Sequence, residues 1–413
     1  MTTSPDQPRK VLRGIPRNVW ALGLTSFFTD VSSEMVLNLV PLFLFNVLGV
    51  KTSLIGLIEG IAETTASVLK IFSGYISDRI GQRKWLTASG YGLSAISKPM
   101  LYFATSWAGV LGVRFADRTG KGIRTAPRDA LIADSVKEEQ RGLSFGLHRA
   151  ADTGGAMLGL VIAAFVIWGA QAGLHTLTRD TFQKVVLFSV IPGLLGVLSV
   201  VIGAQEAGKK TGLAKLPSLS LRGFDTRFKA FLFILVLFTL GNSSDAFLIL
   251  RAQERGLSVL QVMGMLITFN LIYALLSTPA GALSDRVGRS RLIIGGWFAY
   301  SLVYLGFAVA GSGWQIWVFY ALYGIYYGLV EGTARAFVAD LVYPEQRGTA
   351  YGVYNAAVGL TAFPASLIAG ILWQGIGSWV GFGPSAPFFF GAGMALLAVL
   401  LLGIWLPTLK RTH

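Results

Sequence analysis

The sequence predicts an all-α membrane protein whose twelve transmembrane helices form two six-helix lobes related by pseudo-symmetry. Three observations lead to this prediction: an apolar composition, apolar stretches of membrane-spanning length along the whole chain, and an internal repeat. Of the 413 residues, 53% are hydrophobic and 14% are charged, whereas a soluble domain carries about 25% charged residues. The chain therefore lacks many of the charged side chains that a water-exposed surface needs.

Apolar stretches of about 20 residues, the length that crosses a hydrocarbon core, recur throughout the chain. They predict twelve spans, at 18–46, 52–76, 86–105, 108–132, 143–168, 184–204, 229–250, 258–283, 291–311, 314–339, 350–374 and 385–406. A polar and basic stretch, 205–228, separates the two halves and is typical of a linker. We therefore expect an N-terminal lobe at 1–204 and a C-terminal lobe at 229–413.

Basic side chains gather in alternate loops, which predicts the orientation in the membrane. They precede the first span, follow the second, fourth, eighth and tenth, and fill the linker, whereas the other loops hold little beyond Lys51, Arg179, Arg251 and Arg255. Positive loops face the cytoplasm, so both termini are predicted to be cytoplasmic, in the inner membrane of a bacterial cell. This distribution, rather than nucleic-acid binding, accounts for the net charge of +14.

An internal repeat predicts the two-lobe architecture. GYISDRIGQRKWL at 74–86 matches GALSDRVGRSRLI at 281–293, and ADSVKEEQRGLSFGLHRAA at 133–151 matches ADLVYPEQRGTAYGVYNAA at 339–357. Each half holds an even number of spans, so the two copies share one orientation and are related by an axis along the membrane normal.

The doubled loop motif, the six-plus-six layout and the basic central loop resemble the major facilitator superfamily of secondary transporters. The resemblance implies that the Asp78 carboxylate latches the lobes on the cytoplasmic side, with Gly74 and Gly81 allowing close helix approach and a tight turn. Asp285 would do the same in the second copy. The expected latch residues are Gly74, Asp78, Arg79, Gly81, Arg128, Asp285 and Arg286. For Arg128, near the end of its span, an interfacial role is an equally good interpretation.

Charged residues form a stripe along the fourth predicted span. Arg114, Asp117, Arg118, Lys121, Arg124 and Arg128 share about one third of the helix circumference. An arginine or lysine at the bilayer centre costs at least about 2.5–3.5 kcal/mol, so the stripe must face other helices or a water-filled path. The stretch from Arg118 to Ala126 also resembles the superfamily's R-x-x-x-G-x-x-x-A motif, which implies that Arg118 takes part in proton coupling.

Acidic residues on the first two spans complement this stripe. Asp30, Glu34 and Asn38 follow one another at four-residue spacing, and so do Glu59 and Glu63. A carboxylate removed from water binds a proton more readily, so Asp30, Glu34, Glu59 and Glu63 are the predicted proton-coupling acids, together with Arg118. The alternative interpretation pairs these acids with the cations of the fourth span as static ion pairs.

The second lobe carries fewer charged residues, and we expect its aromatic side chains to form apolar substrate walls. The candidates for such walls are Phe238, Phe247, Tyr273, Tyr323, Tyr326 and Tyr327. Counting both lobes, the predicted substrate-binding residues are Asn38, Lys98, Arg114, Lys121, Arg124, Asp245, Asn270, Tyr323 and Tyr327. Glu331 and Arg335, four residues apart, are predicted to pair with each other.

These residues leave three classes of function open. The first is proton-coupled export of small amphipathic or drug-like compounds by alternating access. The second is proton-coupled transport, in either direction, of a specific organic anion or metabolite that binds Lys98, Arg118, Lys121 and Arg124. An enzyme is disfavoured, because the sequence has no nucleophile elbow or phosphate loop, no cysteine, and three histidines.

The fifth span bears on the direction of transport. Its Gly155 and Gly159 match only part of a glycine-rich antiporter motif, because Leu160 stands where that motif has proline, and close helix packing explains the glycines equally well. We expect the partners to be a small-molecule substrate, protons and the lipid bilayer, with a monomeric protein that uses the proton gradient and needs no metal or other cofactor.

Overall fold

The computed structural model describes residues 14–171, 173–206 and 220–408. Throughout that part of the chain the secondary structure is helical and contains no strand. Helical segments lie where the twelve spans were predicted, and eight of them are long and apolar enough to cross a membrane. The predicted class, an all-α membrane protein, is therefore confirmed.

The first lobe runs from Arg17 to Gly203. Its helices are α2 (Arg17–Leu37), α3 (Val40–Leu42) with a π-helical turn (Phe43–Val47), α4 (Thr52–Ile80), α5 (Arg83–Ser97) with a 3-10 continuation (Lys98–Phe103), α6 (Trp107–Ser135), α7 (Arg141–Gln171) and α8 (Arg179–Leu198) with a π-helical turn (Ser199–Gly203). α2 packs on α7 and α8, while α6 packs on α4 and α5. The 3-10 segment begins next to Pro99, which lacks the N–H that would continue the α-helix.

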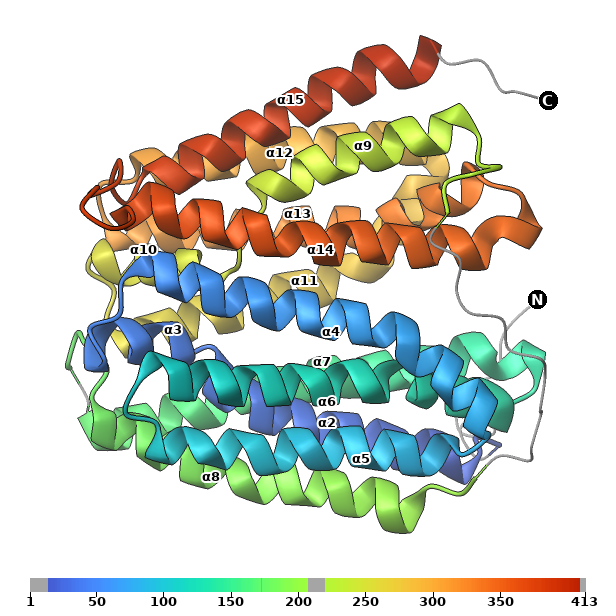
Figure 1. The fold of residues 1–413 in the computed structure, drawn as a ribbon, viewed down its shortest axis with the longest axis horizontal. Helices are drawn as coiled ribbons and strands as arrows, with labels where there is room; N and C mark the ends of the chain where they lie inside the picture. Colours follow the sequence, from blue (N-terminus) through green and yellow to red (C-terminus); the bar gives the residue numbers. More distant parts are fainter. Residues whose placement is uncertain (1–13, 172, 207–219, 409–413) are drawn as a thin grey trace, which may run out of the picture.

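The second lobe repeats this arrangement. It lies above the first lobe in the view of Figure 1. Its helices are α9 (Thr226–Gly241), α10 (Ala246–Glu254), α11 (Val259–Val287), α12 (Arg289–Val309), α13 (Gly313–Asp340), α14 (Arg347–Gln374) and α15 (Ala386–Thr408). α12 packs on α13 and α15, α11 on α13, and α9 on α15. Most of the expected linker, 207–219, lies outside the described residues.

The matching turns of the internal repeat have matching geometry. Gly81 ends α4 with φ of 67° and donates its N–H to the carbonyl of Ser77 at 2.9 Å. Gly288 ends α11 with φ of 96° and donates to the carbonyl of Ser284 at 3.1 Å. A residue with a Cβ rarely adopts such positive φ values, which explains why glycine occupies both positions.

The lobes meet along α4 with α14 and along α7 with α11. At one end, Thr52 donates through its N–H to Gln374 Oε1 at 2.9 Å and through its hydroxyl to the Gly370 carbonyl at 3.1 Å. Further along, the Thr64 hydroxyl donates to the carbonyl of Gly359 at 2.7 Å. The Thr52 contacts close the interface at the end of the bundle opposite to the start of α2 and the end of α15, whereas the Thr64 contact lies near the middle of α4.

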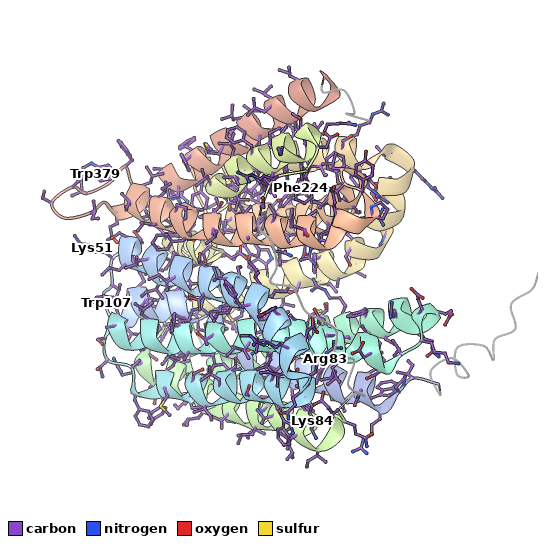
Figure 2. The ribbon with its side chains drawn as sticks, turned by 45° about the vertical axis from the view of Figure 1, so that its right-hand side comes forward. Lys51, Arg83, Lys84, Trp107, Phe224 and Trp379 are labelled. Carbon is purple, nitrogen blue, oxygen red and sulfur yellow. The ribbon has the colours of Figure 1, made fainter. Side chains whose placement is uncertain are left out.

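Lys51, Trp107 and Trp379 mark this closed end in Figure 2, whereas Arg83 and Lys84 lie toward the other end. The latter end also holds the start of α2 and the end of α15, and we call it the terminus side. It is the side on which the basic loops of the repeat lie, because the turns at Gly81 and Gly288 are there.

Aromatic side chains fill the core of the second lobe. Tyr300, Tyr304 and Tyr323 are buried and in ring contact with one another, and Phe238 stacks on Trp297 with ring centroids 4.4 Å apart. These rings therefore stabilise the lobe from within.

Arg251, predicted to lie in a loop, is instead fully buried at the closed end. Its guanidinium donates to the carbonyls of Phe307 and Ala308 at 3.0 and 2.9 Å, and to Glu254 at 2.7 Å. It thereby satisfies the last carbonyls of α12, which have no partner within their own helix.

Candidate substrate and proton site

A cavity of about 370 Å³ lies between the two lobes. Helices α2, α4 and α6 line it from the first lobe, and α9, α10, α13 and α14 line it from the second. Among the described residues it receives six carboxylates and four cationic side chains, namely Asp30, Glu34, Glu59, Glu63, Asp117 and Asp245, and Arg114, Arg118, Lys121 and Arg124. The wall of the cavity is therefore strongly polar.

The cations of the cavity wall all come from the charged stripe on α6. Arg114, Arg118, Lys121 and Arg124 line the cavity, together with Asp117. Such a stripe is tolerated in a membrane helix only where it is kept away from lipid, and the space between the lobes does this. Arg128, one turn further along, lies beyond the cavity wall.

Two of the predicted proton-coupling acids are held in ion pairs. Glu59 pairs with Arg114, and both side chains are almost completely buried, with 6% and 2% exposed. Glu63 pairs with Arg118 at 2.8 Å. For these residues the structure shows the static pairing that the sequence left as an alternative, so Arg118 is bound to a carboxylate on α4 in this conformation.

Asp30 and Glu34 differ, because the described part of the chain gives neither of them an ion pair. Glu34 Oε2 accepts a hydrogen bond from Asn38 Nδ2 at 2.7 Å, as their four-residue spacing favours. Asp30, one turn earlier on α2, also lines the cavity. These two carboxylates of α2 therefore face the cavity without a bound cation.

Lys98 lies behind the cavity wall rather than in it. Its ammonium is buried and donates to the hydroxyls of Ser32 and Ser33 at 2.8 and 3.0 Å. Ser33 in turn lines the cavity. Lys98 therefore does not line the cavity in this conformation, and its role in substrate binding stays a prediction.

Arg124 is positioned by partners that the sequence analysis did not single out. Its guanidinium donates to Ser94 Oγ at 2.6 Å and stacks over the ring of Tyr91 at 4.5 Å. Both partners lie on α5. The sequence did contain a signal for these partners, because the hydroxyl-bearing residues of α5 recur at helical spacing and therefore share one face of the helix.

The second lobe contributes one charged side chain to the described cavity wall, Asp245. It lies where the seventh span is interrupted between Gly241, the last residue of α9, and Ala246, the first of α10. The hydroxyl of Tyr323 donates to its carboxylate at 3.3 Å. Asn242 and Tyr327 also line the cavity.

The expected aromatic substrate wall is mostly absent. Of the six aromatic candidates only Tyr327 lines the cavity, because Phe238, Tyr323 and Tyr326 are buried in the lobe core. Asn270 does not line it either, since its side chain donates to the carbonyl of Leu266 one turn earlier on α11. Burial of large rings stabilises the lobe, and periodicity alone could not distinguish that role from substrate contact.

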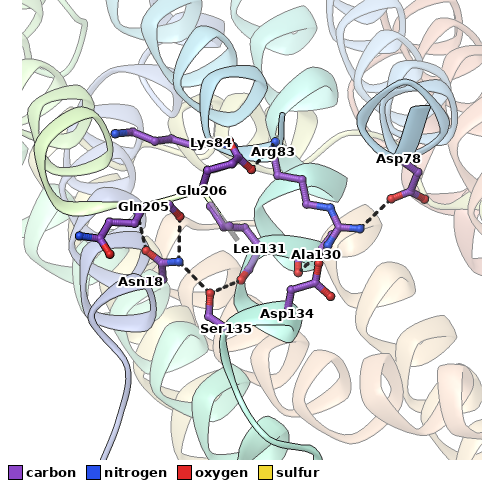
Figure 3. A network of polar contacts seen from close by, with 10 residues as sticks. All are labelled: Asn18, Asp78, Arg83, Lys84, Ala130, Leu131, Asp134, Ser135, Gln205 and Glu206. Atoms are coloured by element: carbon purple, nitrogen blue, oxygen red, sulfur yellow. Dashed lines mark hydrogen bonds and ion pairs between the residues drawn. The ribbon is translucent and has the colours of Figure 1, made fainter. Parts of the chain in front are cut away.

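Asp78, one of the predicted latch residues, lies at the terminus side in the polar network of Figure 3. Asp78 accepts from Arg83 at 2.9 Å, and Arg83 also pairs with Asp134 and donates to the carbonyl of Ala130 at 3.2 Å. Glu206 accepts from the N–H groups of Arg83 and Lys84 and so caps the start of α5. None of these contacts reaches the second lobe, since they join the first lobe to itself and to Glu206 just after it.

The second lobe has a corresponding contact 206 residues later. Arg289 pairs with Asp340 at 2.6 Å and donates to the carbonyl of Ala336 at 3.2 Å. The same contact therefore occurs in both lobes. In each, the arginine that follows the glycine turn binds the terminus-side end of the next long helix, which is the fourth span in the first lobe and the tenth in the second.

The other predicted latch residues form no contact between the lobes among the described residues. Arg128 pairs with Asp129 at 2.8 Å and lies 3.3 Å from the Ser26 hydroxyl, whereas Arg79 and Arg286 are exposed. The side chain of Asp285 lies outside the described part of the structure. The cross-lobe role of Asp78 stays a prediction for a conformation closed on the terminus side.

The closest approach between α4 and α6 lies at Gly122 on α6 rather than at Gly74 on α4. A Cβ at Gly74 would meet Ala126 Cβ at 3.4 Å, an ordinary contact. A Cβ at Gly122 on α6 would collide with α4, and Ser73 donates to the Gly122 carbonyl at 2.8 Å. Gly81 does form the predicted tight turn.

A cross-lobe contact missed by the sequence analysis lies between the cavity and the terminus side. Arg149 on α7 donates to the hydroxyl of Tyr273 on α11, whose hydroxyl also lies 2.7 Å from Glu331 on α13. Glu331 also contacts Arg335, as predicted, at 3.5 Å. The contact with Arg149 could not be predicted from local spacing, because Arg149 lies in the first half of the chain and its partners lie in the second.

Comparison of the sequence with known protein families identifies the family of this chain. The profile described as Major Facilitator Superfamily matches residues 22–249 and 230–413, which together cover nearly the whole chain. The chain belongs to the major facilitator superfamily. It is therefore a transporter and not an enzyme, and a multi-pass integral membrane protein.

Named relatives and solved structures within the superfamily are also similar to this chain. An MFS-type transporter of Methanocaldococcus jannaschii is 35% identical, covering 94% of this chain and 95% of that protein. The multi-drug resistance efflux pump PmrA of Streptococcus pneumoniae is 24% identical over 76% of this chain and 79% of that protein. The crystal structure of the nucleoside transporter NupG aligns with a TM-score of 0.73 at 14% identity, covering 95% of this chain and 100% of that one.

Proposed function

We propose that this superfamily member is a proton-coupled exporter of small amphipathic or drug-like compounds, which works by alternating access. The observation that carries the proposal is the presence of Asp30 and Glu34 on the cavity wall without a cationic partner among the described residues. Carboxylates in such a position are groups that bind and release protons.

The charge balance of the cavity supports coupling to protons. Its described carboxylates exceed its cations by two, and uncompensated charge is costly in a site removed from water. Protons on Asp30 and Glu34 would compensate that excess. We infer that the lobes change conformation at low cost when these two carboxylates are neutralised and at higher cost when they are charged.

The arrangement of the lobes supports alternating access. The cavity lies between two structurally repeated lobes, and at one end the contacts of Thr52 with α14 hold the lobes together. Those contacts must separate for a solute to leave at that end, while the contact of Arg149 with the second lobe lies nearer the terminus side. Both sets of contacts are present in this structure, and a rocking motion of the two lobes would break one set at a time.

The direction of transport rests on relatives and on the charge of the loops. The pneumococcal relative is named as an efflux pump, which supports export for this chain. The basic loops support a cytoplasmic terminus side, in the inner membrane of a bacterial cell. We further propose that the monomer is the transporting unit and that the proton gradient drives it without a cofactor.

Transport in proteoliposomes tests the proposal. Compounds that raise the melting temperature of the purified protein identify ligands, and their flux is then measured with and without an imposed pH gradient. We expect the gradient to drive flux and Glu34→Gln or Asp30→Asn to abolish it. The matched control is Asp180→Asn, because Asp180 is exposed and pairs with Lys184 away from the cavity. Flux that ignores the gradient would identify a facilitator instead.

Transport of an organic anion remains a second candidate, because two buried donors of Arg114, Nε and Nη1, have no acceptor among the described residues. Arg118→Ala and Lys121→Ala would then remove binding of a negatively charged ligand selectively. Unaltered binding in both variants would count against an anionic solute. The excess of carboxylates in the cavity favours the first proposal.

A further inference from the structure

The loop between α14 and α15 displays apolar side chains on the outside of the protein. It comprises residues 375–385, GIGSWVGFGPS, and contains no charged residue. Val380 and Phe382 are 80% and 74% exposed, and Ile376 and Trp379 are exposed as well. Contiguous apolar surface of this kind marks a site of contact with another molecule or with a membrane.

The backbone of this loop is folded tightly onto the end of α14. The N–H of Phe382 donates to the carbonyl of Leu372 at 2.8 Å. Gly375 and Gly381, both with φ of 75°, pack so closely against each other that neither has room for a Cβ. The fold of the backbone therefore holds the apolar side chains outward.

The corresponding connection of the first lobe, between α7 and α8, lacks such a surface. In its described part, 173–178, Leu174 is the one exposed large apolar side chain, whereas Leu177 is buried and the exposed His175 and Thr176 are polar. The apolar loop therefore belongs to the second lobe alone and is not a product of the repeat.

The length of α14 places the loop at the level of the lipid headgroups. The 28 residues of α14 make a helix about 42 Å long, which matches the thickness of a bilayer with its headgroups, about 40–45 Å. Trp107, Trp168 and Trp314 are exposed at the same end of the bundle, and tryptophan gathers at membrane–water interfaces. Figure 2 shows Trp379 of the loop at this end, together with Trp107.

The loop also continues a face of the protein that borders lipid. Helix α15 is a candidate membrane span that packs on α9, α12 and α14 of its own lobe. On its other side Phe389, Leu396 and Leu400 are exposed and recur at helical spacing. In a bilayer this face meets the acyl chains, so the loop that precedes it meets the headgroups above them.

We propose that the loop 375–385 inserts its apolar side chains into the bilayer leaflet at the closed end, among the headgroups and the upper acyl chains. Val380 and Phe382 leave water there, which favours insertion in proportion to the apolar area that is buried. Because the loop carries no charge, it needs no anionic lipid. Insertion also requires neither proton coupling nor a particular solute.

Insertion connects the leaflet to the contact between the lobes. Gln374, the last residue of α14, directly precedes the loop, and its side chain accepts the N–H of Thr52 across the lobe interface at 2.9 Å. The lipid anchor and this closed-end contact therefore share one helix end. The leaflet holds the second-lobe side of the contact in place.

Fluorescent labels on the loop test insertion. Because the chain has no cysteine, Val380→Cys and Phe382→Cys are each labelled with the environment-sensitive dye NBD and placed in phosphatidylcholine nanodiscs. We expect blue-shifted emission, and stronger quenching by a nitroxide at the top of the lipid acyl chain than by one near its end. Asp180→Cys, exposed at the start of α8 at the same end, is the aqueous control. Leu397→Cys, on an exposed part of α15, is the control for deep lipid.

Each pattern of quenching decides the question. Shallow quenching at both loop positions, with deep quenching at Leu397→Cys and iodide quenching from water at Asp180→Cys, would support insertion. Iodide quenching of the loop equal to that of Asp180→Cys would place the loop in water and overturn the inference. Protection from iodide and from both nitroxide lipids would mean that protein covers the loop, and would overturn it as well.

A charge placed in the loop tests the apolar contact itself. With the dye at Phe382→Cys, Val380→Asp should reduce quenching by the shallow nitroxide about twofold or more, because a carboxylate resists transfer out of water. Ser378→Asp is the matched control, because Ser378 is an exposed polar residue of the same loop. Replacing part of the phosphatidylcholine by phosphatidylglycerol should change nothing. Equal loss in both variants, or quenching that requires the anionic lipid, would contradict insertion by apolar side chains.

Discussion

The guanidinium of Arg149 on α7 lies 3.8 Å from the carboxylate of Glu331 on α13 and also binds the hydroxyl of Tyr273. This contact joins the two lobes. It lies nearer the terminus side than the closed end, because Arg149 is in the first third of α7 and Glu331 is in the last third of α13. Movement of the lobes apart on the terminus side must break it.

Loss of this contact should therefore open the cavity further toward the terminus side. We expect Arg149→Gln to speed labelling of a cysteine placed at Ala362, on the cavity wall, by an impermeant maleimide applied from that side. The absence of natural cysteines makes the label specific. Arg335→Gln is the control, because Arg335 contacts the same Glu331 carboxylate within one lobe. Equal labelling of both variants would show that Arg149 does not hold the lobes together.

The buried pair of Glu59 and Arg114 predicts a large cost for removing either partner alone. Breaking a buried ion pair leaves an uncompensated charge and costs about 3–5 kcal/mol. We expect Glu59→Gln and Arg114→Met each to lower the melting temperature, and the double variant to recover part of the loss. A double variant as unstable as the sum of the single ones would mean that the two side chains do not interact.

Arg251 is predicted to stabilise the closed end of the second lobe. In Arg251→Met the carbonyl of Phe307 loses its side-chain donor, at a cost of about 1–3 kcal/mol, whereas the carbonyl of Ala308 keeps the hydrogen bond from the Ser385 hydroxyl at 2.6 Å. Thermal unfolding measures the effect. Arg255→Met is the comparison, because Arg255 is 29% exposed and shares only Glu254 with Arg251; a similar loss in both would assign the effect to that shared carboxylate.

The contact of α7 with α2 depends on small residues. A Cβ at Gly159 would collide with the backbone of Val31, whereas one at Gly169 on the same helix meets nothing within 4 Å. Gly159→Ala should therefore destabilise the protein by about 1–3 kcal/mol, the usual cost of overpacking, and Gly169→Ala should not. Unchanged melting of Gly159→Ala would show that the helices separate without cost.

Part of the candidate site could be predicted from the types of residue and their spacing. A stripe of arginine and lysine on α6 cannot face lipid, so its place away from the bilayer could be inferred from the order of residues alone. The four-residue spacing of Glu34 and Asn38 likewise indicated their hydrogen bond. Lys98, Asn270 and Tyr323 could not be assigned in this way, because a polar or aromatic residue in a membrane helix can serve the solute or the interior of its own lobe.

The membrane class, the approximate positions of the spans and the relation between the halves could be predicted from the amino-acid sequence, because apolar length, glycine turns and the internal repeat can be read from the order of residues; the break in the seventh span between Gly241 and Ala246 could not. Which acids are paired depended instead on the packing of the helices. Glu59 and Glu63 form ion pairs with arginines on α6, whereas among the described residues Asp30, Glu34 and Asp245 form none. Those distances are set by how α2, α4, α6 and the broken seventh span fit together. Charge pairing acts over a few ångströms between residues far apart in the chain, and packing alone sets which charges come that close.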